Sequence, residues 1–556
     1  MALPSFEAND QTHLSRPIRS SSRCVSLDLI SSTHRLTMPS EQSPFDDGFD
    51  TLVKEQLEKW KVPGLSIAII HGPNTYTKAY GKAELLDHST GRPSREMTTD
   101  ALFATCSTTK AFTGATTSIA IQDSKATESP IDWHTPVASL IPEDFILEND
   151  YATKNITLED ALSHRSGMPE HNWTLALFSK KGPTPGSIVR AMRHMPLATP
   201  PRTKYHYSNY MYIAVSHALE QHTGERLGAF MKKRIWDPLG MSETFFSPGE
   251  AKANPATATK LVQAYKWVPT KEGGRFIPQP EHDWPANSGA GAIVSNVLDY
   301  SHWVRELIER TGPLKGHDSL TDPRTIYFQD DDLNLPAPYH AYALGWVVDN
   351  YRGQHLYSHG GGWPGYASWV GFVPEKKFGF VVMGNSFSAR YAAFRLVTYL
   401  LDRQLGLSDD PTYEGQVAGC IERQTETWES SLRNEIMEDS KERLFASLPD
   451  RPLPSALHIS EYTGTYRHPT GATFTIQIIN DRLEADLRDR VIPSELSLVH
   501  ASGEFFVGRI HNAGLDLVSP FSVEFYIDAA GIAQRVGLLL EPAMKEGKLW
   551  FDRCSY

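Results

Sequence analysis

Three short motifs contain residue types that together could carry out nucleophilic catalysis. The first is CSTTKAF, in which Ser107 and Lys110 stand three residues apart at the start of a helix-forming stretch. This spacing places both side chains on one face of a helical turn. A serine hydroxyl needs a neighbouring base, and a buried lysine can serve because desolvation lowers its pKa. The alternative interpretation is a helix-capping serine followed by a surface lysine.

The second motif is YHYSNYMY, which contains Tyr207 and Asn209 and is the only Tyr-x-Asn in the sequence. A tyrosine beside a lysine can share proton transfer, because its phenol can donate to a leaving group and its phenolate can accept from a serine. Asn209 could orient the lysine or bind a substrate amide. A core tyrosine at the start of a helix is the alternative interpretation.

The third motif is YSHGGGWPGY, residues 357–366. HGGG forms part of the oxyanion hole in lipases and esterases of the α/β-hydrolase type, but those enzymes also need a GxSxG nucleophile elbow. The sequence contains no GxSxG, which disfavours that reading. Glycines at 361 and 362 let a substrate backbone approach the predicted strand, where a free N–H can complete an oxyanion hole. His359 could donate to substrate, stabilise the tyrosine, or be a satisfied structural histidine.

The elements that must position these motifs are predicted from hydrophobic periodicity and turn signals. A helix is expected for FDDGFDTLVKEQLEKWKV, followed by a strand LSIAII and its hairpin partner TYTKAYG. Three helices are expected next, in TKAFTGATTSIAIQ, TLEDALSHRSG and NYMYIAVSHALEQHTG. For the second of these, Thr157 is the expected N-cap and Gly167 the expected stop.

Strands are predicted again late in the chain. YALGWVVD, QHLYSHGG and YASWVGFVPEKKFGFVVMGN read as neighbouring antiparallel strands, and ARYAAFRLVTYLLDRQLG reads as a closing amphipathic helix. If the early and late strands share one sheet, the helices between them form a separate layer or lobe. That arrangement is an α+β fold.

The domain organisation predicted from composition has four parts. Residues 1–42 are expected to be a disordered tail, 43–407 the catalytic domain, and 408–456 a linker with a charged helix. The stretch LSDDPTYEG begins that linker. Short alternating strands separated by turn signals predict a small antiparallel β-barrel at 457–556.

Charge and cysteine content exclude several function classes. The net charge is -12, which argues against general nucleic-acid binding and against attachment to anionic membranes. The four cysteines have no CxxC spacing, so they form neither a disulfide framework nor a zinc motif. No apolar run is long enough to span a membrane, and no signal peptide is evident. A cytoplasmic protein is expected; the Arg/Ser-rich start also permits an organelle presequence, against which Glu7, Asp10 and Asp28 count.

The order of the motifs carries more information than any one of them. SxxK, then YxN, then HxG resembles the layout of the serine β-lactamase and penicillin-binding-protein superfamily, in its class C-like branch of esterases, D-aminopeptidases and transesterases. Other matching segments are VPGLSIAII, ITLEDALSHRSGMPEH, RIWDPLGMSETFFS, SGAGAIVSNVLDYSHWV and YALGW. The resemblance covers residues 45–407, and the C-terminal part looks like the lipocalin-like barrel often appended to such proteins.

The resemblance implies a role for each motif residue. Ser107 would be the acylated nucleophile, Lys110 and Tyr207 would share general-base and general-acid work, and Asn209 would position Lys110 and substrate.

At the third motif, the resemblance implies that His359 takes the place of a lysine and that Gly361 gives the substrate backbone room. The backbone N–H groups of Ser107 and Gly362 would form the oxyanion hole. Neither a metal nor another cofactor is expected, since the sequence lacks the HxHxDH pattern of metallo-β-lactamases.

The third motif departs from the Lys-Thr-Gly that is usual in β-lactamases and penicillin-binding enzymes. His359 is mostly neutral at pH 7, and Gly360 lacks the hydroxyl that could bind a substrate carboxylate. Esters, amides or D-amino-acid peptides without a fixed anionic handle therefore fit better than β-lactams.

The sequence thus predicts a β-lactamase/transpeptidase-like α+β fold and a serine hydrolase of small-molecule or peptide esters and amides. An acyltransferase of natural-product metabolism would use the same acyl-enzyme, and a non-catalytic binding protein is the third alternative. The natural substrate and the oligomeric state are left open.

Overall fold

The computed structural model describes residues 43–87, 91–271, 273–281, 283–328, 335–404, 411–432, 440–445, 447–512, 520–544 and 547–554. The tail predicted at 1–42 lies outside these residues. Below, residues 43–404 are called the α+β region and residues 464–553 the barrel.

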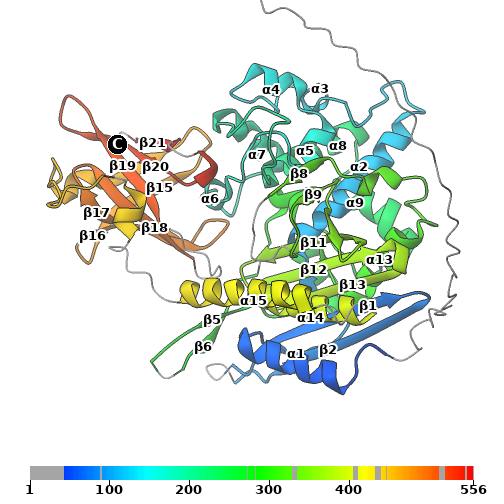
Figure 1. The fold of residues 1–556 in the computed structure, drawn as a ribbon. Coiled ribbons are helices and arrows are strands. Elements are labelled where there is room, and N and C mark those ends of the chain that lie inside the picture. Colours follow the sequence, from blue (N-terminus) through cyan, green and yellow to red (C-terminus); the bar gives the residue numbers. More distant parts are fainter. Residues whose placement is uncertain are drawn as a thin grey trace, which may run out of the picture. The chain divides into compact units, whose positions relative to one another are not determined.

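Within the described residues, one antiparallel sheet of nine strands forms the centre of the α+β region. Its order is β3 (Arg95–Glu96), β2 (Asn74–Glu84), β1 (Gly64–His71), β13 (Phe378–Gly384), β12 (Tyr366–Val373), β11 (Gln354–Trp363), β10 (Val347–Tyr351), β9 (His340–Tyr342) and β8 (Thr325–Tyr327). β1 from the start of the chain pairs with β13 from much later, with Leu65 opposite Gly384 (Figure 1). The early and late strands therefore share one sheet, which confirms the predicted α+β fold.

Both faces of this sheet are covered by helices, which explains why β1 reads as a continuous apolar run. Successive side chains of a strand point to opposite faces. Ile67 packs with Phe394 of α14 (Ala389–Gln404) on one face. Ile70 belongs to the cluster on the other face, which includes residues of α13 (Val297–Glu309).

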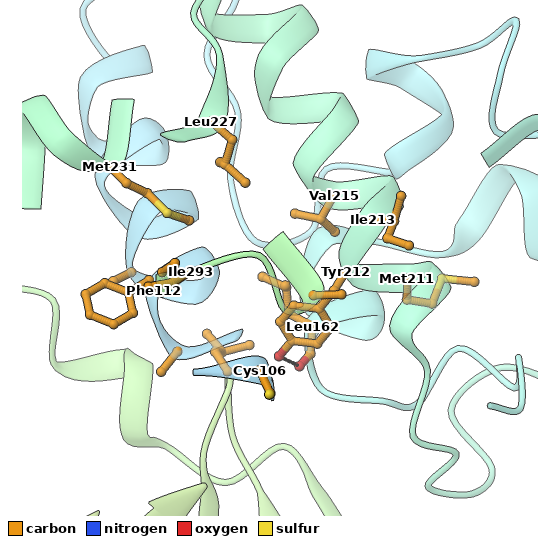
Figure 2. Packing of buried hydrophobic residues seen from close by; sticks show 14 of the residues in the cluster. Cys106, Phe112, Leu162, Met211, Tyr212, Ile213, Val215, Leu227, Met231 and Ile293 are labelled. Atoms are coloured by element: carbon orange, nitrogen blue, oxygen red, sulfur yellow. Dashed lines mark hydrogen bonds between the residues drawn. The ribbon is translucent and has the colours of Figure 1, made fainter. Parts of the chain in front are cut away.

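The segments that carry the candidate site lie mostly between the two sets of strands. They are the 3-10 turn η1 (Cys106–Thr108), α2 (Thr109–Ser124), α5 (Leu158–Leu162), α6 (Asn172–Ala176), α8 (Asn209–Thr223) and the 3-10 segment η4 (Pro285–Ala290). α2 is buried along nearly its whole length, and Phe112 stacks on Trp303 of α13 with ring centroids 4.1 Å apart. Figure 2 shows Tyr212 of α8 beside Leu162 of α5, where the tyrosine hydroxyl donates to the Leu162 carbonyl at 2.6 Å. These contacts join the helices into one core.

Several predicted element boundaries are wrong. The helix expected to run from Thr157 to Gly167 has the predicted N-cap, a capping box between Thr157 and Asp160, but it ends at Leu162. The chain leaves the helix there because His164 takes the left-handed conformation, with φ 58.

Two further boundaries differ from the sequence prediction. YALGWVVD is not one strand, because the chain turns at Gly345 with φ 96 between β9 and β10. α15 (Pro411–Leu432) lies where a charged helix is expected within 408–456, but it begins inside LSDDPTYEG, the stretch expected to precede the helix. A proline is well suited to the first turn of a helix, because backbone N–H groups in that turn have no acceptor within the helix and proline has no N–H.

The barrel is a closed sheet of eight strands among the described residues, as the sequence predicted for the C-terminal part. The strands are β14 (Gly464–Arg467), β15 (Thr473–Ile479), β16 (Arg482–Leu487), β17 (Ser494–Ser502), β18 (Phe505–Asn512), β19 (Phe521–Ile527), β20 (Ala533–Leu538) and β21 (Leu549–Arg553). Alternate side chains such as Phe474 and Ile476 fill its interior. The outer limits predicted for the four domains remain predictions.

Candidate active site

Ser107 lies in a tight turn at the entrance to α2. The residue before it, Cys106, is a non-glycine residue with φ 54, a conformation that costs on the order of 1–3 kcal/mol and that clusters at functional sites. β11 packs against this turn: a Cβ added to Gly361 would lie 2.4 Å from the Thr105 carbonyl oxygen. Ser368 of β12 donates to that same oxygen at 2.8 Å. The sheet therefore holds Ser107 in place, and only glycine fits at 361.

Lys110 is fully buried one turn further along and reaches three acceptors. Its Nζ donates to Ser107 Oγ at 3.1 Å, to Asn209 Oδ1 at 2.7 Å and to the Ala290 carbonyl at 2.8 Å. Desolvation lowers the pKa of Lys110 to about 7, although the negative charge of Glu170 acts to raise it. A sizeable fraction of this amine is therefore uncharged near neutral pH, when its lone pair can accept a proton.

The Ala290 carbonyl is a component of the site that sequence reasoning missed. It ends η4, a segment in which Ser288 has φ 41. A side-chain motif search does not reveal a backbone acceptor. The available signal was the segment SGAGAIVSN, in which closely spaced small residues permit such a backbone turn.

Tyr207, two residues before α8, contacts the Ser107 hydroxyl directly. Its hydroxyl donates to Ser107 Oγ at 2.9 Å. Desolvation raises the pKa of Tyr207 well above its usual range, although the hydrogen bond to Ser107 opposes this. The phenol therefore carries its proton at neutral pH, whereas Lys110 is partly uncharged, so Lys110 can act as the base and the phenol can pass on a proton.

Asn209 begins α8 and links Lys110 to the mouth of the site. Besides accepting from Lys110, it donates through Nδ2 to Asn172 Oδ1 at 3.0 Å. Asn172 in turn donates to Glu170 Oε2 at 2.7 Å. Sequence reasoning assigned no role to Glu170, which lies in the matching segment ITLEDALSHRSGMPEH, or to Asn172, which lies just after it.

His164 holds the backbone on both sides of Tyr207. The Ser208 N–H donates to His164 Nδ1 at 3.0 Å, and the His206 N–H donates to the His164 carbonyl at 2.7 Å. An accepting Nδ1 places the ring proton on Nε2. Burial and the charge of Lys110 hold the pKa of His164 well below its usual range, so the imidazole is neutral. The sequence motif SHRSG contained this residue, but it was read only as the end of a helix.

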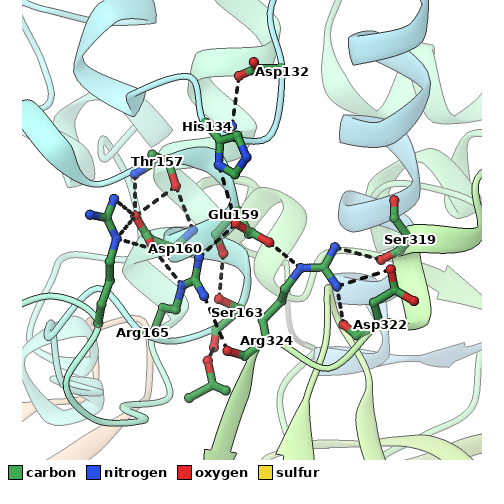
Figure 3. Close-up of polar contacts among 12 residues, drawn as sticks. Asp132, His134, Thr157, Glu159, Asp160, Ser163, Arg165, Ser319, Asp322 and Arg324 are labelled. Atoms are coloured by element: carbon green, nitrogen blue, oxygen red, sulfur yellow. Dashed lines mark hydrogen bonds and ion pairs between the residues drawn. The ribbon is translucent and has the colours of Figure 1, made fainter.

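A network of charged side chains around the fully buried Asp160 supports this segment (Figure 3). Asp160, at the end of the capping box, accepts from Arg165 Nε at 2.7 Å and from Arg202 at 2.7 Å. Glu159 pairs with Arg165 at 2.8 Å and also with Arg324. The Arg202 N–H donates to the Arg165 carbonyl. These bonds tie the chain around His164 to the chain that leads into Tyr207.

His359 lines the cleft but uses both ring nitrogens within the protein. Nδ1–H donates to the Gly360 carbonyl at 2.6 Å, so Nε2 accepts from the Tyr342 hydroxyl at 2.9 Å. Desolvation, followed by the charge of Lys110, lowers the pKa of His359 to about 3. The side chain is therefore uncharged at neutral pH.

The cleft consists of two adjoining cavities that share Ser107. The larger, of about 370 Å³, is lined by Tyr207, His359 and Gly360 among others. The smaller, of about 210 Å³, lies on the side of Trp363. Residues that line both cavities are Ser107, Asn172, Asn209, Gly362 and Phe387. Gly361 and Gly362 thus lie along the cleft wall, and their predicted role in substrate binding stays a prediction.

The described residues contain neither a cluster of metal ligands nor a membrane-spanning helix. In the parts of the chain that the structure describes, no three His, Cys, Asp or Glu residues are grouped so as to hold a metal ion. Over the same residues, no helix has the length and apolar character needed to cross a membrane.

Comparison with known families gives two matches. Residues 49–401, more than half of the chain, match the family described as Beta-lactamase. Residues 448–553 match a family described only as a domain of unknown function, DUF3471.

Relatives with curated names cover nearly the whole chain. An unguisins hydrolase of Aspergillus campestris is 34% identical over 520 residues, which is 92% of both chains. A second unguisins hydrolase, of Aspergillus violaceofuscus, is 31% identical and covers 92% of this chain and 91% of its own. A D-aminopeptidase of Cereibacter sphaeroides is 23% identical over 82% of this chain and 80% of its own.

Solved structures agree on the fold. The octameric penicillin-binding protein homologue of Pyrococcus abyssi superposes with a TM-score of 0.54 at 21% identity, over 91% of this chain and 100% of that one. A D-amino acid amidase of Ochrobactrum anthropi gives a TM-score of 0.51 at 21% identity, over 65% of this chain and 98% of that one.

Fold and site together define a serine hydrolase of the β-lactamase/transpeptidase type. The chain belongs to the beta-lactamase family, as the family match and the two fungal relatives show.

Proposed function

We propose that the protein hydrolyses an amide bond, or the corresponding ester, of a small molecule or peptide through an acyl-enzyme on Ser107. One observation carries the proposal: Ser107 Oγ lies 3.1 Å from Lys110 Nζ and 2.9 Å from the Tyr207 hydroxyl. A nucleophile with a base and an acid both within hydrogen-bonding distance is the arrangement that acyl transfer requires.

Acylation follows from the protonation states. Uncharged Lys110 takes the Ser107 proton while Oγ forms a bond to the substrate carbonyl carbon. The carbonyl oxygen becomes an oxyanion that the backbone N–H groups of Ser107 and Gly362 stabilise. As the C–N bond breaks, Tyr207 gives its proton to the departing nitrogen and recovers one from the Lys110 ammonium.

Deacylation reverses these roles with water in place of the amine. Uncharged Lys110 accepts a proton from water as the water oxygen attacks the ester carbonyl. When the tetrahedral intermediate collapses, Ser107 Oγ leaves and regains its proton. The product is a free carboxylic acid, and the site returns to its starting protonation state.

The chemistry of the third motif supports amides or esters rather than β-lactams as substrates. A buried, uncharged His359 does not supply the cation that would hold a substrate carboxylate. The relatives are named for hydrolysis of unguisins and for D-aminopeptidase activity, which supports a peptide or D-aminoacyl amide. Trp346 and Tyr366, two aromatics that could line the acceptor site of an acyltransferase, are buried in the core, whereas Trp363 lines the smaller cavity. The names of the relatives favour hydrolysis over acyl transfer.

A fluorophosphonate probe tests the acyl-enzyme directly. Wild-type protein should be labelled, with the adduct mapped by mass spectrometry to the peptide containing Ser107, and Ser107→Ala should be neither labelled nor active on D-amino-acid amides. Labelling elsewhere, or amide hydrolysis retained by Ser107→Ala, would refute the proposal. Measuring product with and without an added amine separates hydrolysis from acyl transfer.

A further inference from the structure

The loop between β16 and β17 of the barrel packs into the α+β region instead of closing over its own barrel. Its backbone forms a short antiparallel contact with the chain after α6. The Lys180 N–H donates to the Asp489 carbonyl at 3.1 Å, and the Val491 N–H donates to the Phe178 carbonyl at 3.0 Å. Between them, Ser179 and Arg490 form an isolated antiparallel bridge. The loop is therefore fixed against the α+β region by its main chain.

At this contact, the barrel and the α+β region each contribute hydrophobic side chains to the core of the other. Val491 and Ile492 are 6% and 7% exposed and belong to the core cluster of the α+β region. In the opposite direction, Leu177 belongs to the core cluster of the barrel, and Trp173 packs against that cluster. Such reciprocal burial fixes the position of the loop, because displacing it would expose apolar surface on both sides.

The two exchanged barrel side chains form part of the wall of the smaller cavity beside Ser107. Val491 and Ile492 line it together with Leu175, Trp363 and Phe387. Its lining includes the amides of Asn172, Asn209 and Asn287 and the hydroxyl of Ser107, and none of the described lining residues is Lys, Arg, Asp or Glu. The volume of about 210 Å³ exceeds the ~150 Å³ of an engineered apolar cavity that binds benzene. The cavity therefore suits an uncharged, apolar side chain up to the size of a phenyl group.

The placement of Tyr207 identifies which part of the substrate this cavity receives. Tyr207 lines the larger cavity and not the smaller one. A group that protonates the leaving nitrogen must lie on the leaving-group side of the scissile bond. The leaving group then occupies the larger cavity, which assigns the smaller cavity to the acyl side.

We infer that the barrel loop 489–492 forms an acyl-side specificity pocket that selects substrates with an apolar side chain next to the scissile carbonyl. This inference rests on the proposed acyl-enzyme chemistry, which supplies the orientation of the substrate. The barrel thus has a direct part in substrate choice.

The test varies the acyl side chain while the leaving group is kept constant. D-alanine, D-leucine and D-phenylalanine p-nitroanilides are assayed with full-length wild-type protein, Ile492→Phe and Val491→Thr. Ile492→Phe reduces the space in the pocket. We expect kcat/KM for the phenylalanine substrate to fall at least ~10-fold, because a misfitting group in an apolar pocket costs ~1–3 kcal/mol. The value for the alanine substrate should stay within ~2-fold of wild type. Val491→Thr is nearly isosteric but adds a hydroxyl, and should lower the phenylalanine-to-alanine ratio several-fold.

The matched control is Ile478→Phe, the same replacement on the barrel at a side chain that is 40% exposed. It should leave all three rates unchanged. If Ile492→Phe does not fold, as judged by its melting temperature, Val491→Thr decides the question alone.

Two failures are distinguishable. Active variants whose preference among the three substrates equals that of wild type would overturn the pocket and leave the acyl-enzyme proposal standing. A wild-type protein that hydrolyses none of them and is not labelled at Ser107 would overturn the proposed function itself.

Discussion

The imidazole of His164 lies against the phenol ring of Tyr207, with ring centroids 4.4 Å apart. His164 also accepts backbone hydrogen bonds from the two neighbours of Tyr207 in the chain. The orientation of Tyr207 therefore depends on His164, although His164 itself has no hydrogen bond to Ser107 among those described. Several consequences of this arrangement can be measured.

Replacing His164 should affect turnover more than binding. His164→Ala removes the acceptor for the Ser208 N–H, and we expect kcat to fall ~100-fold with KM nearly unchanged, as misplacing a catalytic group by ~1 Å does. His164→Asn is the matched variant, because Asn keeps an acceptor near Nδ1 and tolerates the positive φ of this position. It should retain at least ten times the kcat of the alanine variant. Equal kcat values for the two variants, at equal melting temperatures, would show that His164 does not position Tyr207.

Lys110→Arg should abolish activity although it conserves charge. An arginine side chain keeps its proton at all accessible pH values, so it cannot accept the proton of Ser107. We expect kcat to fall by ~10²–10⁴, the range of a lost general base. Steady-state rates on a D-amino-acid amide measure this, and Lys78→Arg, at a salt-bridged surface position, is the control. An arginine variant within tenfold of wild type would exclude Lys110 as the base.

The pH dependence of kcat/KM should rise through neutrality. Because desolvation lowers the pKa of Lys110 to about 7, the uncharged, basic form grows from about a tenth of the protein at pH 6 to about nine-tenths at pH 8. His359, whose pKa is lowered to about 3, does not titrate in this window. Rates measured between pH 5 and 9 should therefore show an ascending limb with its midpoint near 7. A rate that is flat or falls from pH 6 to 8 would contradict the assignment of the base.

Asp160→Asn should destabilise the protein. The amide cannot replace the buried carboxylate that accepts from Arg165 and Arg202. The two arginines are partly exposed, so the loss of these charged hydrogen bonds should cost about 1.5–3 kcal/mol of unfolding free energy. The exposed Asp150→Asn is the control and should change stability by less than about 0.5 kcal/mol. Urea denaturation measures both. Similar midpoints for the two variants would show that the charge network does not stabilise this segment.

Nitrocefin should be a poor substrate compared with D-amino-acid amides. Its carboxylate would meet an uncharged imidazole at the third motif, where a lysine is usual in the superfamily, and losing a charged hydrogen bond costs about 1.5–3 kcal/mol. We expect kcat/KM for nitrocefin to be ~10- to 150-fold below that of the best amide. Comparable values would show that another group in the cleft holds the carboxylate.

Local patterns predicted the elements of the fold better than their ends. The apolar run at β1 and the helix that carries Lys110 were predicted where they occur, because burial on all sides leaves a dense hydrophobic signal. The end of α5 was missed, since it depends on His164 meeting backbone groups more than forty residues later in the chain. A short stretch of sequence around α5 does not include Ser208, which donates to His164.

The candidate site was predictable to the extent that side-chain motifs describe it. Ser107 and Lys110 are related by helical spacing, whereas their proximity to Tyr207 and Asn209 followed only from resemblance to a family. The Ala290 carbonyl leaves no side-chain signature. Val491 lies in a separate barrel, and nothing in the sequence around it indicates that it reaches the cleft.

The exchange of side chains between the barrel and the α+β region also limits how the chain can be divided. A fragment that ends before the barrel would keep every residue of the three motifs, but it would expose Leu177 and Trp173 and leave empty the space that Val491 and Ile492 fill. The isolated barrel would present those same two aliphatic side chains to solvent. Neither half has a complete hydrophobic core, so the two parts are expected to unfold as one cooperative unit and to resist separation by truncation or domain shuffling.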